Sequence, residues 1–291
     1  MGLTLFLMTQ KGLAVLDALT THFPALVATV VGSRDASIEK DYYDEIKALC
    51  ERKNVLFRDR KEPVETKTPY ALAISWRWII KAGTAELIVL HDSLLPRYRG
   101  FNPLVSMLIN GEDRIGVTAL FATEEYDCGL VIGRSSTPIA YPLKIQQAID
   151  LVAKNYADLV LRIARTLSAG EELEGVPQDE SQATYSLWRD DEDYYIDWNW
   201  AAERIKRLVD AVGHPYKGAA ARLDGRTLRV RDCEVVKDVL IENRSPGKVI
   251  FVRDSLPVVV CGSGLLRLTD LVDEETKNTL LPLPRFRCRF R

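Results

Sequence analysis

Short apolar runs alternate with helix-like segments through the first half of the chain, and no other feature limits its fold as strongly. The runs occupy 3–8, 26–31, 55–57, 70–76 and 86–91. Helical periodicity at 11–22 and 38–52 joins the first three of them. Runs of this length separated by helices are typical of a parallel sheet that is buried on both faces. We therefore predict an α/β fold with a doubly wound, mostly parallel sheet.

The next part of the chain extends this pattern and then breaks it. The sequence predicts a helix at 103–109, strands at 116–122 and 130–139, and a long helix at 145–167. A polar, acidic stretch with a proline follows at 171–183 and indicates a domain boundary.

A different architecture is expected beyond that boundary. After a helix at 200–212, short strands alternate with turns such as Asp224-Gly225 about every ten residues. This spacing indicates a small all-β barrel or sandwich. We predict an N-terminal domain over 1–180 and a C-terminal β domain over 181–291.

Composition limits the partners and the compartment. The 291 residues hold 39 Lys and Arg against 41 Asp and Glu, a formal net charge of −2, whereas a protein that grips long nucleic acid usually carries a basic surplus. The five cysteines lie far apart and form no CxxC pair, so we expect neither a zinc site nor a disulfide framework. No run reaches the ~18 apolar residues of a membrane span. We expect a cytoplasmic protein without a membrane partner.

Two segments carry residues suited to chemistry. His91 ends an apolar strand and opens HDSLLPRYRGFNPL, and Asp127 lies in EEYDCG at 124–129. In a doubly wound sheet, ligands bind at the carboxyl ends of the strands, so His91 is a candidate general acid or base. Asp127 is a candidate to orient its imidazole or to accept a proton. The alternative is that both are ordinary surface or capping groups.

These segments resemble a known family. HDSLLPRYRG at 91–100 closely resembles the HxSLLPxxxG signature of the folate-dependent formyltransferases, and Gly116-Val117-Thr118 with Asp127-Cys128-Gly129 resembles their GVT strand and DxG loop. Ile196-Asp197-Trp198 and His214-Pro215-Tyr216 resemble the start of the family's C-terminal domain. The resemblance covers nearly the whole chain and implies a Rossmann-like catalytic domain followed by a small barrel-like β domain.

The resemblance also implies an activity. In this family a formyl group moves from N10-formyltetrahydrofolate, a co-substrate, to an amine. Carried over by position, His91 is the general acid/base beside the formyl carbon, and Asp127 holds its imidazole and helps to move protons. No covalent intermediate is required, so Cys128 is expected to be a packed residue and not a nucleophile.

Further binding residues follow from the same resemblance. Folate is expected to lie against the strand end and the signature loop, at Ser75, Trp76, Arg77, Trp78, Leu94 and Leu95, although core packing is an alternative role for the two tryptophans. Arg97, Tyr98 and Asn102 are candidates to meet the phosphate or hydroxyl groups of the substrate.

One position departs from the family. Where the family has an asparagine two residues before the histidine, whose amide helps to bind the formyl oxygen, this chain has Val89. Valine cannot donate a hydrogen bond. Either Asn102 or a backbone N–H replaces the missing donor of the oxyanion site, or the activity is weak or altered.

The accepting amine is inferred by exclusion. The tRNA enzymes of the family carry a basic insertion after the second strand, but the equivalent segment here, 33–45, is short and acidic and would repel a polyphosphate. The purine-pathway enzyme lacks a long C-terminal domain. We therefore expect a nucleotide-linked amino-deoxy sugar as the small-molecule substrate, no tRNA partner, and a homodimer. The alternatives are a methionyl-tRNA formyltransferase-like enzyme and, because of Val89, a non-catalytic member that binds folate or a nucleotide.

Overall fold

The computed structural model describes residues 2–35, 38 and 40–291, and these form two compact units. The first unit contains the described residues of Met1–Leu104, Asp113–Ile139 and Gln147–Leu187. The second contains Val105–Glu112, Ala140–Gln146 and Trp188–Arg291. Both units therefore draw on discontinuous segments of the chain. Among the described residues, no helix is both long and apolar enough to cross a membrane.

The first unit is built on a mixed sheet that, over the described residues, has seven strands in the order β3-β2-β1-β4-β5-β7-β8. The strands are β1 (Leu3–Leu7), β2 (Val27–Gly32), β3 (Leu56–Asp59), β4 (Tyr70–Ile74), β5 (Glu86–His91), β7 (Arg114–Phe121) and β8 (Val131–Pro138). The pairings from β3 to β5 are parallel, and β7 and β8 are antiparallel additions. Every residue of β1 and β4 is buried, as a strand covered on both faces requires. The predicted α/β class and mostly parallel sheet are confirmed.

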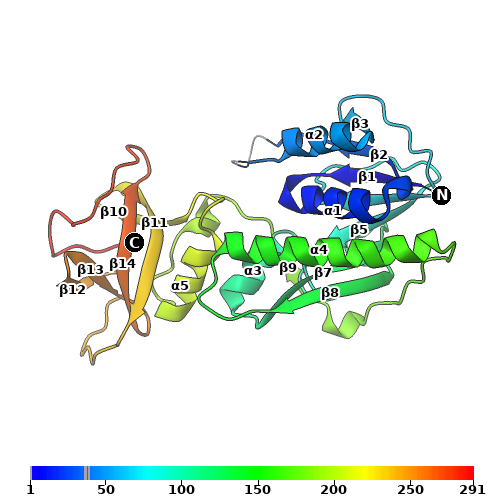
Figure 1. Ribbon diagram of the computed structural model, residues 1–291. Coiled ribbons are helices and arrows are strands. Elements are labelled where there is room, and N and C mark those ends of the chain that lie inside the picture. Colours follow the sequence, from blue (N-terminus) through cyan, green and yellow to red (C-terminus); the bar gives the residue numbers. More distant parts are fainter. Residues whose placement is uncertain (1, 36–37, 39) are drawn as a thin grey trace. The chain divides into compact units, whose positions relative to one another are not determined.

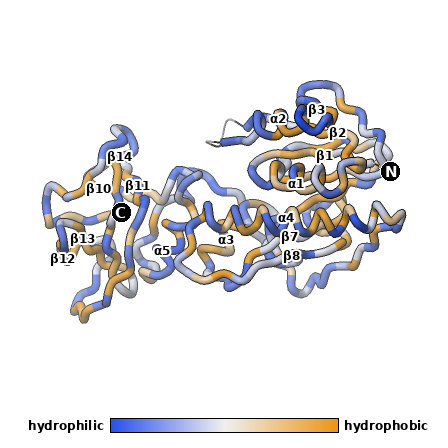
Figure 2. Tube along the Cα trace, viewed as in Figure 1, coloured by the Kyte–Doolittle hydropathy of each residue, from blue (hydrophilic) through white to orange (hydrophobic). Residues whose placement is uncertain are grey.

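Three long helices accompany this sheet: α1 (Thr9–His22), α2 (Tyr43–Lys53) and α4 (Ile145–Ser168). Figure 1 shows α4 running beside β7 and β8, where the Thr137 hydroxyl donates to Asn155 Oδ1 over 2.9 Å. Figure 2 shows hydrophobic residues concentrated along β1 and β2.

The helix predicted over 38–52 begins later than expected. Residue 39 lies outside the described residues, and α2 starts only at Tyr43. The reason is Asp41, whose carboxylate accepts the backbone N–H of Tyr43 over 3.0 Å, while Tyr42 adopts a left-handed φ of 61°. A side-chain acceptor at this point satisfies a free N–H of the first turn, which is how helices commonly begin.

The second unit holds an antiparallel sheet with the order β10-β11-β14-β13-β12. Its strands are β10 (Ala219–Leu223), β11 (Arg226–Val236), β12 (Val249–Arg253), β13 (Leu256–Val260) and β14 (Leu265–Asp273). Helix α5 (Ala202–Ala211) contacts β11 and β14. Most of α3 (Pro103–Asn110) also belongs to this unit, and Arg207 Nε of α5 donates to the carbonyl of Ile109 over 3.0 Å.

Residues 288–291 join the two edges of this sheet. At the β10 edge, Arg222 and Arg291 exchange backbone hydrogen bonds of 2.6 and 2.9 Å. At the β12 edge, the N–H of Val249 donates to the carbonyl of Cys288 and the N–H of Phe290 donates to that of Gly247. The segment therefore gives an open antiparallel sheet a barrel-like closure.

Candidate active site

The end of β5 and the loop after it hold the signature histidine in place. His91 is the last residue of β5 and lies opposite Thr118 of β7. The Thr118 hydroxyl donates to the carbonyl of Ser93 over 2.7 Å and accepts from the N–H of Leu95 over 3.1 Å. One buried hydroxyl thus fixes the start of the loop, which gives the imidazole a rigid support.

His91 and Asp127 meet in the structure. The distance from His91 Nδ1 to Asp127 Oδ1 is 3.4 Å, and their side chains are only 9% and 10% exposed. The other ring nitrogen, Nε2, lies 2.8 Å from the carbonyl oxygen of Tyr98. A carbonyl oxygen can only accept, so Nε2 carries a hydrogen, and in a neutral imidazole Nδ1 is then the basic nitrogen. The basic nitrogen therefore faces the carboxylate.

Asp127 is itself held by backbone and side-chain groups. Its Oδ2 accepts the N–H of Gly100 over 2.8 Å, and the side-chain amide of Gln178 donates to the carbonyls of Asp127 and Gly129 over 2.6 and 2.9 Å. A Cβ at residue 129 would lie 1.8 Å from the carbonyl oxygen of Phe121, so only glycine is accommodated there. The Asp-Cys-Gly loop is therefore fixed on both sides of the carboxylate.

A buried arginine supports the same wall of the site. Arg99 is 1% exposed. Its guanidinium donates to Gln178 Oε1 over 2.8 Å and to both carboxylate oxygens of Glu180 over 2.8 and 2.6 Å. β6 (Arg99–Gly100) also pairs with β9 (Tyr185–Ser186). The stretch 171–183, which the sequence offers as a domain boundary, thus contributes Gln178 and Glu180 to the site, and no local sequence signal marks them.

A second charged cluster lies directly beside His91. Asp92 forms an ion pair with Lys11 of α1, and the Tyr156 hydroxyl of α4 lies 2.6 Å from Asp92 Oδ1. Burial by itself would raise the pKa of Asp92, but the Lys11 ammonium and the Tyr156 hydroxyl outweigh it and hold that pKa below its ordinary value. Asp92 is inside the signature, but neither Lys11 nor Tyr156 carries a sequence signal. The cluster ties β5 to two helices.

The residues expected to bind folate follow the end of β4. Ser75 adopts a left-handed φ of 53° and accepts a hydrogen bond from the Thr9 hydroxyl, and Arg77 pairs with Asp35. Trp76 packs edge-on against Phe6, with ring centroids 5.2 Å apart.

The contact with Phe6 is the core packing that is the alternative to folate binding for Trp76. The indole Nε1 of Trp76 is nevertheless buried and has no hydrogen-bond partner among the described residues. The neighbouring ring of Trp78 lies 5.3 Å from that of Trp76 and carries the Arg60 guanidinium 4.2 Å above its centroid.

The signature loop distributes its other candidate residues between the interior and the surface. Leu95 and Tyr98 are buried, Leu94 is half-buried, and Arg97 and Asn102 are exposed. Arg97 lies over the ring of Tyr98 at 5.2 Å. Tyr98 meets His91 through its backbone carbonyl, not through its phenol. Burial raises the pKa of the Cys128 thiol, so this group is a poor nucleophile.

Val89 lies on the same face of β5 as His91, because residues two apart in a strand point to the same side. Its neighbours in register are Ala73 of β4 and Leu120 of β7, and it is half-buried. The position that lacks the family's amide is therefore adjacent to the histidine, and its strand neighbours there are apolar.

Comparison with known proteins extends the likeness to both units. Residues 69–159 match the family described as formyl transferase, and residues 189–281 match the formyl transferase C-terminal domain. A methionyl-tRNA formyltransferase of Methylobacillus flagellatus is 34% identical over 182 residues. The aligned part is 62% of this chain and 57% of that protein, so the chain spans little more than half the length of this relative.

Two solved structures share the fold over nearly their whole length. WlaRD, a sugar 3N-formyl transferase determined with dTDP and 5-N-formyl-THF, has a TM-score of 0.69 and 13% identity, and the match covers 94% of this chain and 97% of that one. An N-formyltransferase of Helicobacter canadensis, determined with folinic acid and dTDP-3-aminofucose, has a TM-score of 0.68 and 13% identity, with coverages of 92% and 98%.

Proposed function

Because the chain belongs to the folate-dependent formyltransferase family, we propose that it transfers a formyl group from N10-formyltetrahydrofolate to the amine of a nucleotide-linked amino-deoxy sugar. The observation that carries the chemistry is the approach of His91 Nδ1 to Asp127 Oδ1 at 3.4 Å, at the carboxyl end of a central strand. The identity of the acceptor rests on separate observations, given below.

Formyl transfer to an amine requires a base for the amine proton and donors for the oxyanion that develops. The co-substrate supplies the activated formyl carbon. In the chain, the hydrogen on His91 Nε2 stays with the carbonyl of Tyr98, so Nδ1 takes the amine proton as the amine nitrogen bonds to the formyl carbon. Nδ1 then returns a proton to N10 of the folate as the bond between the formyl carbon and N10 breaks. The imidazolium between these two steps has an acceptor at each nitrogen, with Asp127 facing Nδ1. Asp127 thus stabilises the charged form and orients the ring.

The residues at the end of β4 suit a pterin. The buried Nε1 of Trp76 has no hydrogen-bond partner among the described residues, and an unpaired buried donor costs stability unless a ligand satisfies it. A pterin presents ring nitrogens and a carbonyl oxygen that accept hydrogen bonds. Ser75, Trp76, Arg77 and Trp78 would hold this ring, and Leu94 and Leu95 would line the loop opposite.

The segment 33–45 favours a small acceptor over tRNA. Residues 36, 37 and 39 lie outside the described residues. Arg34 pairs with Asp44, and Lys40 pairs with Glu45 over 2.9 Å. Both cations of the segment thus pair with its own carboxylates, so the segment presents no positive surplus to phosphates. The acceptor class of the two sugar N-formyltransferases that share this fold agrees with this proposal.

The experiment is an acceptor screen with the full chain and N10-formyltetrahydrofolate. The panel holds dTDP-, UDP- and GDP-linked amino sugars and methionyl initiator tRNA, and the readouts are tetrahydrofolate release and product mass. Asp127→Asn is the control, because it retains the shape of the side chain and removes its charge. We expect formylation of at least one amino sugar by the wild type and at least about 100-fold less by the variant.

Two other results would redirect the assignment. Robust formylation of methionyl-tRNA at physiological salt would show that the tRNA activity of the sequence relatives extends to this chain, and it would overturn the sugar acceptor. Folate binding without turnover on any acceptor would favour the non-catalytic alternative that Val89 raises. Quenching of tryptophan fluorescence by tetrahydrofolate measures that binding independently of turnover.

A further inference from the structure

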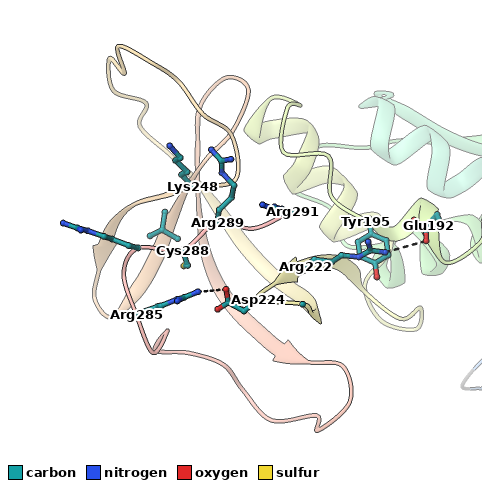
Figure 3. Close-up of a pocket in the computed structure, with 12 residues that line it drawn as sticks. Glu192, Tyr195, Arg222, Asp224, Lys248, Arg285, Cys288, Arg289 and Arg291 are labelled. Atoms are coloured by element: carbon teal, nitrogen blue, oxygen red, sulfur yellow. Dashed lines mark hydrogen bonds and ion pairs between the residues drawn. The ribbon is translucent and has the colours of Figure 1, made fainter.

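The second unit contains a cavity of about 890 Å³ where residues 285–291 cross the edges of its sheet (Figure 3). Its charged lining is strongly one-sided. Six cations line it, Arg222, Lys248, Arg285, Arg287, Arg289 and Arg291, against the two carboxylates of Glu192 and Asp224. The whole chain has a net charge of −2, so this concentration of positive charge is local.

The first like-charge pair in this cavity is Lys248 with Arg289, which form an antiparallel bridge. The hydrogen bonds around the bridge come from the flanking residues, so the two cations occupy a non-hydrogen-bonded pair, in which side chains lie closest. Figure 3 shows both side chains projecting in the same direction. Like charges directly opposite each other on a sheet are destabilising.

The second like-charge pair lies at the other edge of the same segment. Arg222 and Arg291 exchange both of their backbone hydrogen bonds and therefore stand directly opposite each other. Glu192 offsets this pair weakly, since it lies 3.8 Å from the Arg222 guanidinium and is 80% exposed. The Arg222 guanidinium also lies over the ring of Tyr195, 4.7 Å from its centroid, so like charges oppose each other at this edge as well, but less closely than in the first pair.

The carboxylates of the cavity leave much of its charge uncompensated. Asp224 pairs with Arg285, and the Arg289 guanidinium donates to the hydroxyl of Ser245, which carries no charge. Among the described residues, no side-chain carboxylate lies within ion-pairing distance of Lys248, Arg287 or Arg291. All three are exposed to solvent. The cavity therefore presents cations that are ready to receive an anion.

We propose that this cavity is a binding site for a compact oligophosphate, such as the phosphate chain of a nucleotide. Guanidinium groups bind phosphate oxygens with paired hydrogen bonds, and several phosphates on one ligand would relieve both like-charge pairs together. A cavity of this volume is in the range of small-molecule sites. The chain's lack of a basic surplus disfavours a long nucleic acid as the occupant. The site goes beyond the proposed formyl transfer and uses neither His91 nor Asp127.

The test is calorimetric titration of the full chain with inorganic triphosphate, together with its effect on the melting temperature. The test variant is the double substitution Arg287→Gln/Arg291→Gln, and the matched control is Arg253→Gln, an exposed arginine of the same unit outside the cavity. We expect triphosphate to bind wild type and control equally and to raise both melting temperatures. The double variant should bind at least about tenfold more weakly, since a hydrogen bond to a charged group is worth about 1.5–3 kcal/mol.

Several outcomes would overturn the proposal. One is a wild type that does not bind triphosphate, and another is equal binding by the double variant. A third is binding of an RNA oligonucleotide that triphosphate cannot displace, which would identify the surface as a nucleic-acid site. If the double variant fails to fold, Lys248→Gln replaces it with the same expected loss of affinity. Formyl transfer by the double variant is assayed in parallel, and unchanged turnover separates this site from the proposed active site.

Discussion

The two units use charged side chains in opposite ways. Around His91 each charged group meets an opposite partner, and every pair has at least one largely buried member: Asp127 faces the imidazole, Lys11 pairs with Asp92, and the exposed Glu180 pairs with the buried Arg99. Around residues 285–291, exposed cations stand opposite one another. Burial penalises an unpaired charge heavily, whereas solvent screens like charges at the surface. Charges that pair with opposite charges therefore indicate a site whose side chains are held in a fixed geometry. Charges that stand opposite like charges indicate a surface that binds an oppositely charged ligand.

The largest expected effect comes from breaking the His91–Asp127 pair. His91→Ala and Asp127→Ala should each lower turnover by at least about 100-fold, because a positioned acid/base contributes about 10²–10⁴-fold. Steady-state kinetics on one validated acceptor measures this, with circular dichroism as the check on folding. Near-normal turnover by either variant would remove that residue from the mechanism.

The next effect concerns the buried ion pair of the same unit. Asp92→Asn leaves the Lys11 ammonium without its partner and should lower the free energy of unfolding by about 3 kcal/mol at pH 7. Asp158→Asn, on an exposed part of α4, is the control and should change it little. Denaturant unfolding measures both.

The pH dependence of that loss has a defined sign. The pKa of Asp92 in the folded state lies below its ordinary 3.8, so its ion pair stabilises the fold above pH 3.8. This contribution is lost as the pH falls through the lowered folded-state pKa. The stability gap between wild type and Asp92→Asn should therefore be constant from pH 7 to about pH 5 and shrink below pH 4. A gap that widens on acidification contradicts the assignment.

A substitution at Val89 tests whether the site lacks an oxyanion donor. One such donor is worth about 10²–10³-fold in turnover. Val89→Asn should therefore raise turnover by up to this factor and change the affinity for folate little. Asn102→Ala is the companion variant. If wild type is already fast and Val89→Asn does not improve it, another donor fills the site, and a loss of turnover in Asn102→Ala would identify that donor.

The smallest effect belongs to the uncompensated surface. Lys248→Gln removes the close like-charge pair with Arg289 and should raise the free energy of unfolding by about 0.2–1 kcal/mol in the absence of ligand. The gain should diminish at high ionic strength, which screens exposed charges. Lys237→Gln, another exposed lysine of the same unit, serves as the reference in thermal unfolding. A stability loss in Lys248→Gln would mean that the pair is not repulsive.

Sequence patterns predicted individual strands correctly but missed contacts between residues that are far apart in the chain. β5 follows the predicted run 86–91 residue for residue, since the apolar residues 87–90 are all at least partly buried and the run ends at His91. Gln178 and Glu180 could not be predicted, because they reach Arg99 across 79 and 81 residues of chain and no spacing encodes such a contact. The assignments of His91 and Asp127 came from a family signature, and the structure adds the imidazole's bond to Tyr98.

The inclusion of α3 in the second unit has a consequence for synthesis on the ribosome. Ile109 and its partner Arg207 are 98 residues apart, so α3 is made well before the helix it binds. At synthesis rates of about 5–20 residues per second, the delay is about 5–20 seconds. During that interval the apolar side chains of Val105, Met107 and Leu108, which are buried in the finished fold, lack their final surroundings. The nascent chain thus exposes a short hydrophobic segment to chaperones, and slower translation lengthens that exposure.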